Sequence, residues 1–284
     1  VYSGALCYAD DLTLLCPSLR GLNTMLQICA DFADEYSVAF NATKTVAVTF
    51  DPKNLRVVPG NAFLNGEAIA WAKETKHLGN YVQSNLSDAR DIAYKKGLFI
   101  GSFNNLMSNF HFVSYRIRCR LFLTNCMSYY GSQMWSLSCP ELCTLFTSWN
   151  VAVRRLLKLP RTAHTWSLAP LLGSKHLKNQ LLHRNLTFLK NCAGNTNALV
   201  NAVFSAAYDD ARTHMGQNIA KMRSYGVFNF DNYCSIEVEE PLHDDQFFSV
   251  ECAREILYYL DGSIDIPVLE QSDANNFLHF LLCG

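Results

Sequence analysis

Near the start of the chain, hydrophobic residues recur at three- and four-residue intervals. They are Leu19, Leu22, Met25, Leu26, Cys29, Phe32 and Ala33. This spacing puts them on one side of an α-helix. Pro17 and Ser18 come just before, and serine is a favoured helix N-cap. The pattern predicts an amphipathic helix over residues 19–36, whose apolar side covers a sheet.

Short apolar runs around this helix predict strands. Residues 5–8 and 12–16 form a tight hairpin in this interpretation, with the turn Ala9-Asp10-Asp11 at its tip. Further strands are expected over 38–40 and 45–50, on either side of Asn41-Ala42-Thr43-Lys44. Residues 63–64 and 68–71 flank Asn65-Gly66, a dipeptide that favours a type I′ hairpin turn. Residues 1–83 are therefore predicted to mix α and β structure.

From Leu86 onward the helical period dominates. Helices are predicted over 86–109, 114–135, 139–158, 174–192, 198–224 and 246–260. Pro160, Pro170, Gly173 and the run Gly194-Asn195-Thr196-Asn197 interrupt the pattern. We expect an α+β protein with a mixed region over 1–83, a helical region over 84–193 and a further region over 194–284.

Composition narrows the class of protein. The eleven cysteines have no regular spacing and mostly aliphatic neighbours, which fits reduced thiols in a nuclear or cytoplasmic protein. No apolar run reaches the roughly 18 residues that span a bilayer, and no secretory leader is evident, so no membrane association is expected. The chain begins with Val1 and a strand follows at once. We expect it to be a piece of a longer protein.

Charge is distributed very unevenly along the chain. Residues 1–91 hold 7 Lys and Arg against 10 Asp and Glu, residues 92–190 hold 13 against 1, and residues 191–284 hold 4 against 14. The basic residues of the middle stretch are Lys95, Lys96, Arg116, Arg118, Arg120, Arg154, Arg155, Lys158, Arg161, Lys175, Lys178, Arg184 and Lys190. This asymmetry favours a polyanionic partner. The alternative is a solvated helical surface that the acidic C-terminal third neutralises.

Three Asp-Asp pairs are candidates for chemistry. Asp10-Asp11 lies between two apolar strands, where a rigid hairpin tip would present carboxylates to a divalent ion and a phosphate chain. Asp209-Asp210 falls in a helical pattern and Asp244-Asp245 in an acidic loop, so both are expected on solvated surfaces. By itself an acid pair in a turn is ordinary, because Asp is a common turn residue. The order of the surrounding features makes the first pair distinctive.

That order resembles the reverse transcriptase of non-LTR (LINE-type) retrotransposons. Tyr8-Ala9-Asp10-Asp11 resembles the family's motif C, the run from Phe40 to Thr45 its motif D, and Leu78-Gly79 lies where its primer-grip motif E falls. The basic stretch is similar to the family's thumb, including Tyr130-Gly131-Ser132 and Arg154-Arg155-Leu156-Leu157-Lys158. The resemblance covers about residues 1–190. It implies a partial polymerase palm of antiparallel hairpins with a packed helix, then a mostly α-helical thumb and a C-terminal helical region.

The resemblance also implies roles for single residues. Asp10 and Asp11 would be catalytic metal ligands of a two-Mg²⁺ phosphoryl-transfer site. Lys44 would protonate or neutralise the leaving pyrophosphate, although an ordinary exposed lysine at a strand end is equally compatible with the sequence. His77, Leu78 and Gly79 would place the primer end. Lys95, Lys96, Arg116, Arg118, Arg120, Arg154, Arg155 and Lys158 would hold the backbone of an RNA template and DNA primer, with deoxynucleoside triphosphates as substrates.

Several alternatives stay open. The family's upstream metal-binding aspartate, its fingers and its nucleotide-selecting motif have no counterpart in this sequence, so we expect the isolated chain to be inactive as a polymerase. A non-catalytic nucleic-acid-binding module is the alternative function. A structural zinc site is disfavoured because the candidate ligands lack zinc spacing. These ligands are Cys119, Cys126, Cys139, Cys143, His111 and His164. The four tryptophans, Trp71, Trp135, Trp149 and Trp166, are expected in the core.

Overall fold

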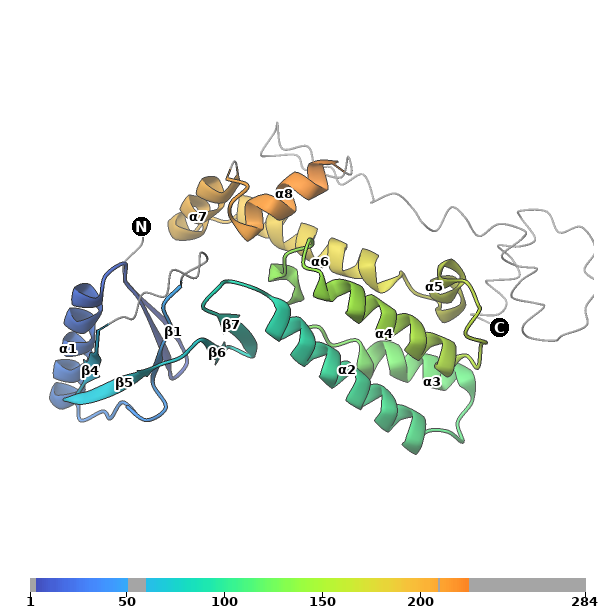
Figure 1. Cartoon of the computed structure of the whole chain (residues 1–284), viewed down its shortest axis with the longest axis horizontal. Helices are drawn as coiled ribbons and strands as arrows, with labels where there is room; N and C mark the ends of the chain where they lie inside the picture. Colours follow the sequence, from blue (N-terminus) through green and yellow to red (C-terminus); the bar gives the residue numbers. More distant parts are fainter. Residues whose placement is uncertain (1–3, 51–59, 209, 225–284) are drawn as a thin grey trace, which may run out of the picture. The chain divides into compact units, whose positions relative to one another are not determined.

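The structure is a computed structural model that describes residues 4–50, 60–208 and 210–224. The chain divides into two compact units between Arg90 and Asp91. The first unit combines strands with a helix, and the described part of the second is helical (Figure 1). The fold class is α+β, as predicted.

The described residues of the first unit form three small sheets and a helix. The helix is α1 (Leu19–Tyr36), and the strands are β1 (Gly4–Tyr8), β2 (Asp11–Leu15), β3 (Val46–Ala47), β4 (Ala62–Leu64), β5 (Glu67–Trp71), β6 (Glu74–His77) and β7 (Asn80–Gln83). The pairs β1–β2 and β6–β7 are antiparallel hairpins. In the third sheet β5 is central, antiparallel to β4 and parallel to β3.

Helix α1 has the predicted bounds, and its position follows from its sequence. The Ser18 hydroxyl accepts a hydrogen bond from the Gly21 N–H at 3.2 Å, which caps the helix. Its buried residue Leu26 belongs to one hydrophobic cluster with Ala62 and Leu64 of β4 and Ile69 of β5. Asn23 fastens the helix along β4, because its side chain donates to Asn61 O at 3.3 Å and accepts from Phe63 N at 3.2 Å. The helix therefore covers the sheet and satisfies a free strand edge (Figure 1).

The described part of the second unit is built from helices around two buried clusters. Its helices are α2, which begins in the first unit (Ala89–Asn109), α3 (Tyr115–Leu121), α4 (Glu141–Leu156), α5 (Leu168–Leu172), α6 (Leu177–Ala193), α7 (Ala198–Tyr208) and α8 (His214–Ser224), with short turns η1 (Phe122–Cys126), η2 (Ser132–Met134) and η3 (Thr165–Ser167). Phe99, Phe122 and Trp149 lie in the larger cluster. Phe204 and Ile219 lie in the smaller one. The prediction that Trp135 and Trp149 lie in the core is confirmed, whereas Trp166 is 45% exposed.

Several predicted elements were wrong. A single helix over 114–135 does not form: α3 ends at Leu121, a π-helical turn follows, and Gly131 takes a left-handed φ of 82°. Residues 198–224 form two helices, because the turn after Tyr208 folds α8 back onto α7. Within 38–50 only β3 joins a sheet. The helix predicted over 246–260 lies outside the described residues.

Of the two hairpins that end in glycine-containing turns, one was predicted from the sequence and the other was not. Asn65 and Gly66 have φ of 52° and 78°, both positive as the predicted type I′ turn requires. The hairpin β6–β7 was not predicted. Its turn residues Leu78 and Gly79 also have positive φ, 45° and 81°. The sequence signal was weak because leucine rarely occupies the left-handed region.

Candidate functional site

The hairpin β1–β2 carries the first acidic pair at its tip. Tyr8 and Asp11 are opposite each other in the ladder, so Ala9 and Asp10 form the turn. Ala9 has a left-handed φ of 52°, a conformation that costs a non-glycine residue roughly 1 kcal/mol. Both Asp side chains are exposed. A short, strained turn thus presents two neighbouring carboxylates to solvent.

Two carboxylates provide the oxygen ligands that a hard cation prefers. Mg²⁺ commonly binds through one or two carboxylates and substrate phosphates while keeping several waters. Asp10 and Asp11 fit this donor set. Across 4–50, 60–208 and 210–224, no three His, Cys, Asp or Glu side chains come together in a way that could hold a metal ion. Two carboxylates would supply two of the oxygen ligands of such an ion.

Asp210, from the second acidic pair, has a different environment. Its carboxylate pairs with the Arg212 guanidinium through contacts of 2.8 Å to each oxygen, and also accepts from the Arg212 N–H. These bonds lower the pKa of Asp210 to about 2. Both oxygens of this carboxylate therefore already bind Arg212 of the same loop. The third pair, Asp244-Asp245, and also Asp209, lie outside the described residues.

Lys44 lies in a loop that Asn41 organises. The Asn41 side-chain oxygen accepts from Lys44 N at 3.0 Å and from the Thr43 hydroxyl at 2.7 Å, and its backbone oxygen accepts from Thr45 N at 3.0 Å. This is an Asx-type turn, in which an Asn side chain replaces part of the backbone bonding. The Lys44 side chain is exposed, two residues before β3. Sequence reasoning did not identify Asn41 as the residue that fixes this loop.

The predicted primer-grip residues form the β6–β7 turn. His77 ends β6 and pairs with Asn80, while Leu78 and Gly79 make the two-residue connection. Asn80 is buried, and its side chain donates to Leu78 O at 3.3 Å. The hydrogen bond from buried Asn80 therefore stabilises the positive-φ conformation of this turn. All three predicted residues lie at one hairpin tip.

Burial divides the predicted nucleic-acid-binding residues into two groups. Lys95 is only 5% exposed, with its ammonium 5.5 Å from the Tyr130 ring centroid, and Arg118 is 8% exposed. Arg154 gives two hydrogen bonds to Ala163 O, at 3.0 and 2.7 Å, and Lys96 donates to the Thr144 hydroxyl at 3.2 Å. Lys95, Lys96 and Arg154 thus contact other groups of the protein, and Arg118 is buried in it. Lys95 and Arg118 have little surface left for a ligand.

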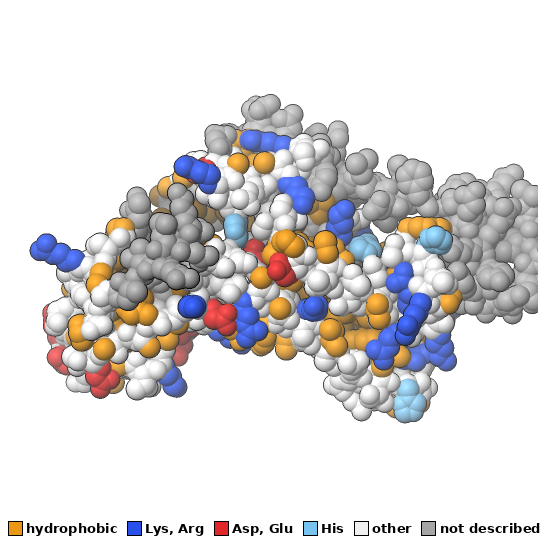
Figure 2. All heavy atoms as spheres, in the orientation of Figure 1, with side chains coloured by type: hydrophobic (Ala, Val, Ile, Leu, Met, Phe, Trp, Pro, Cys, Tyr) orange, Lys and Arg blue, Asp and Glu red, His pale blue; other side chains and the backbone are white. Residues whose placement is uncertain are grey.

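The other four predicted basic residues are exposed, and we call them the exposed basic set: Arg116, Arg120, Arg155 and Lys158. Arg116 and Arg120 are one turn apart on α3. Arg155 stands at the end of α4, with its guanidinium 5.2 Å from the Phe103 ring centroid. Figure 2 shows Lys and Arg side chains gathered where α4 ends, close to α3. This end of the helical unit can offer positive charge to a polyanion.

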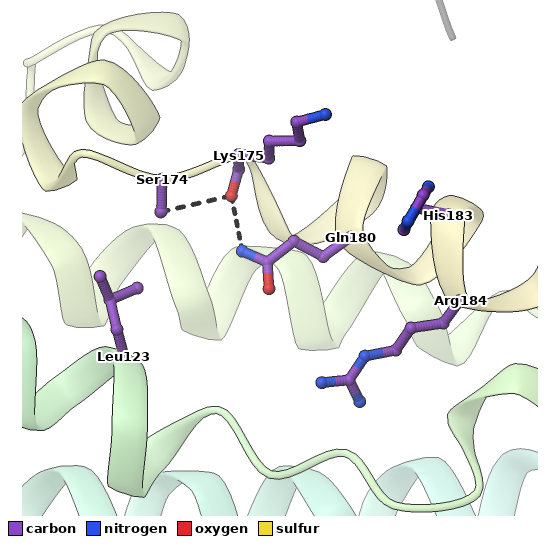
Figure 3. Close-up of a pocket in the computed structure, with 6 residues that line it drawn as sticks. All are labelled: Leu123, Ser174, Lys175, Gln180, His183 and Arg184. Carbon is purple, nitrogen blue, oxygen red and sulfur yellow. Dashed lines mark hydrogen bonds between the residues drawn. The ribbon is translucent and has the colours of Figure 1, made fainter. Parts of the chain in front are cut away.

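A shallow hollow of about 420 Å³ lies beside the start of α6. Leu123 faces Ser174, Gln180 and Arg184 across it, while the Lys175 ammonium points away (Figure 3). Gln180 donates to Lys175 O at 2.6 Å, and Arg184 donates to Tyr129 O at 3.0 Å. The polar groups of this hollow hold the local backbone, so it is a weaker candidate than the exposed basic set.

Sequence reasoning also missed an aromatic loop between α2 and α3. Phe110, His111 and Phe112 are all exposed there, directly before the arginines of α3. Aromatic residues beside basic ones in the sequence could have signalled it.

No family model, curated protein or solved structure matches the chain. In the described part of the chain no helix is long and apolar enough to cross a membrane.

Proposed function

We propose that this chain is part of an RNA-directed DNA polymerase of the LINE type. The observation that carries the proposal is the β1–β2 hairpin, which exposes Asp10 in its turn and Asp11 at the first position of β2. The order of the following elements supports it. Helix α1, the Lys44 loop and the β6–β7 turn follow in the sequence expected of a polymerase palm, and a basic helical unit comes next.

Each element has a role in nucleotidyl transfer. Asp10 and Asp11 would hold Mg²⁺ through their carboxylate oxygens, and the ion would supply charge neutralisation and activation of the primer hydroxyl. Lys44 places a positive charge, or a proton, at the departing pyrophosphate. The β6–β7 turn positions the primer end. The exposed basic set binds template and primer phosphates, which needs charge and no reading of bases.

A non-catalytic nucleic-acid-binding module is the second candidate function. The exposed basic set favours it, because all four residues belong to the helical unit and need no contribution from the hairpin acids. The two functions differ in whether a divalent ion binds at Asp10.

One experiment with two readouts separates them. An RNA–DNA primer–template is titrated with the chain at several salt concentrations, and Mn²⁺-induced broadening of backbone amide signals is followed by NMR. For the polymerase, we expect salt-sensitive binding and broadening around the hairpin that Asp10→Asn removes. The matched control Asp34→Asn, an exposed acid on α1, should leave the broadening unchanged.

The other outcomes are equally informative. Salt-sensitive binding without broadening at the hairpin would favour the non-catalytic module over the polymerase assignment. For duplex DNA the logarithm of affinity changes with the logarithm of salt by about 0.9 per phosphate contact. Replacing all four members of the exposed basic set by Gln should therefore reduce the slope by up to about 3.6. An unchanged slope would show that these residues do not contact the backbone.

A further inference from the structure

The aromatic loop between α2 and α3 places large apolar side chains in water. Phe112 is 75% exposed, Phe110 is 40% exposed, and Tyr115 at the start of α3 is 42% exposed. Burying a phenylalanine side chain stabilises a fold through the hydrophobic effect. The fold gains little of that stabilisation from Phe112. Packing within the described structure therefore does not account for an aromatic residue at this position.

Local contacts hold the loop in one arrangement. Phe110 N donates to Leu106 O at 3.0 Å, which continues α2 by one residue. The His111 Nδ1 lies 3.0 Å from Ser108 O. The His111 ring meets the Phe112 ring edge to face, with centroids 5.6 Å apart and planes at 88°. The Phe112 ring is thus supported from one side and open to solvent on the other.

Positive charge accompanies these rings. Arg116 and Arg120 lie on the exposed side of α3, and chain connectivity keeps the Phe112 and Arg116 Cα atoms within about 14 Å. Glu141 is the only acidic residue between 92 and 190. Aromatic faces beside cationic side chains are the combination that binds single-stranded nucleic acid, since bases stack on the rings and phosphates pair with the cations.

We propose that Phe112, supported by His111, is a stacking platform for an unpaired base, with Arg116 and Arg120 binding the adjacent phosphates. This inference rests on the proposed function and deepens it, because it assigns a single-stranded segment of the nucleic acid to the α2–α3 loop. The exposed basic set can bind the phosphates of a duplex whether or not a base stacks on Phe112.

The test compares two labelled single strands of equal length and charge, one with bases and one abasic. Affinities for the full chain are measured by fluorescence anisotropy. Phe112→Ala should weaken binding of the base-bearing strand about tenfold, within the range of stacking contributions, and leave the abasic strand unaffected. Phe112→Trp should retain affinity. The control Phe63→Ala removes a ring of 47% exposure on β4 and should change neither affinity.

Each result is decisive. If Phe112→Ala weakens both strands equally, or neither, base stacking is rejected while backbone binding stands. If no nucleic acid binds at all, the proposed function falls together with this inference. Vesicles containing phosphatidylserine provide the last comparison. Should Phe112→Ala abolish vesicle binding and spare the base-bearing strand, the loop is a membrane contact and the stacking proposal is wrong. Far-UV circular dichroism verifies that each variant is folded.

Discussion

Three arginines alternate along α3, yet only two of them reach the surface. Successive helical residues are rotated by about 100°, so Arg118 points away from Arg116 and Arg120. Arg118 is 8% exposed and its Nε has no hydrogen-bond partner in the described structure. In the sequence alone, the three arginines cannot be distinguished by their charge. Their position on the helix decides which of them can bind a ligand.

The Asp210–Arg212 pair predicts a titration. Because Arg212 lowers the pKa of Asp210 to about 2, the pair stabilises the fold above the unfolded carboxyl pKa of about 3.9. That contribution is lost as the pH falls from about 3.9 towards 2. Carboxyl NMR signals should show an Asp210 midpoint near 2 that moves towards 3.9 in Arg212→Ala. An Asp210 midpoint near 3.9 in the unsubstituted chain would contradict the ion pair.

Cysteine reactivity provides a second prediction at this scale. The eight cysteines in the described part of the chain form no disulfide with one another. Burial raises the pKa of Cys119 and Cys126 to about 11, whereas Cys7 and Cys143 are exposed. Only the thiolate reacts with alkylating agents. At pH 8, mass spectrometry should find iodoacetamide on Cys7 and Cys143 first, and on Cys119 and Cys126 only in urea. Equal labelling rates in the native chain would disprove the buried positions.

Among the elements, the segment between η1 and α4 depends on side chains from distant helices. Asn218 of α8 accepts from Leu137 N at 2.8 Å and donates to Trp135 O at 2.9 Å. Asn185 of α6 donates to Gln133 O at 2.9 Å. These bonds replace the helical bonds that the segment lacks. Buried backbone groups need such partners, so the irregular path is stable only when α6 and α8 are in place.

The loss of one such side chain should be costly. Asn218→Ala leaves Leu137 N without its partner, which costs about 1–3 kcal/mol for a buried group, and it also removes the shorter of the two hydrogen bonds to Trp135 O, the other being the 3.4 Å bond from Asn185. We expect the free energy of unfolding of the helical unit to fall by about 2–4 kcal/mol in urea titrations. Asn191→Ala, an exposed control on α6, should change it by less than about 0.5 kcal/mol. Similar values for the two variants would refute the role of Asn218.

Elements whose structure is determined by neighbouring residues were predicted from the sequence, and elements that depend on distant residues were not. Helix α1 had the expected bounds because its apolar spacing and its Ser18 cap lie within the helix itself. The Asn65-Gly66 turn was equally local. The break in 114–135 depends on Asn185 and Asn218, which are far away in the sequence. The α7–α8 corner needs Gly216, where a Cβ atom would lie 2.2 Å from Asp210 O, and no short pattern reveals that approach.

The candidate site was predictable to the same extent. The exposed positions of Asp10 and Asp11 follow from a hairpin whose residues are contiguous. The burial of Lys95 and Arg118 follows from packing among several helices, which charge counting does not detect. The aromatic loop was overlooked because exposure, rather than residue type, makes its rings unusual.

At the scale of the whole molecule, the two units differ in what they bury. Among the described residues of the first unit, the buried hydrophobic ones are Leu26, Ala30, Ala33, Ala47, Ala62, Leu64 and Ile69, and most of these are alanines. On α1, Ile28, Phe32 and Tyr36 are 62%, 48% and 59% exposed. The second unit buries Phe99, Phe122 and Trp149 to within 2%. Hydrophobic stabilisation grows with buried apolar area, so the helical unit should be the more stable.

The chain should therefore unfold in two steps, with the first unit unfolding at lower urea concentration. Hydrogen exchange followed by mass spectrometry should show α1 amides exchanging before those of α4. Leu26→Ala and Leu145→Ala form a matched pair, since each removes a buried leucine at a cost of about 2–5 kcal/mol. The first should accelerate exchange only in residues 4–90 and the second only in the helical unit. Simultaneous exchange of both units, or a response of both to either variant, would show that they fold as one cooperative body.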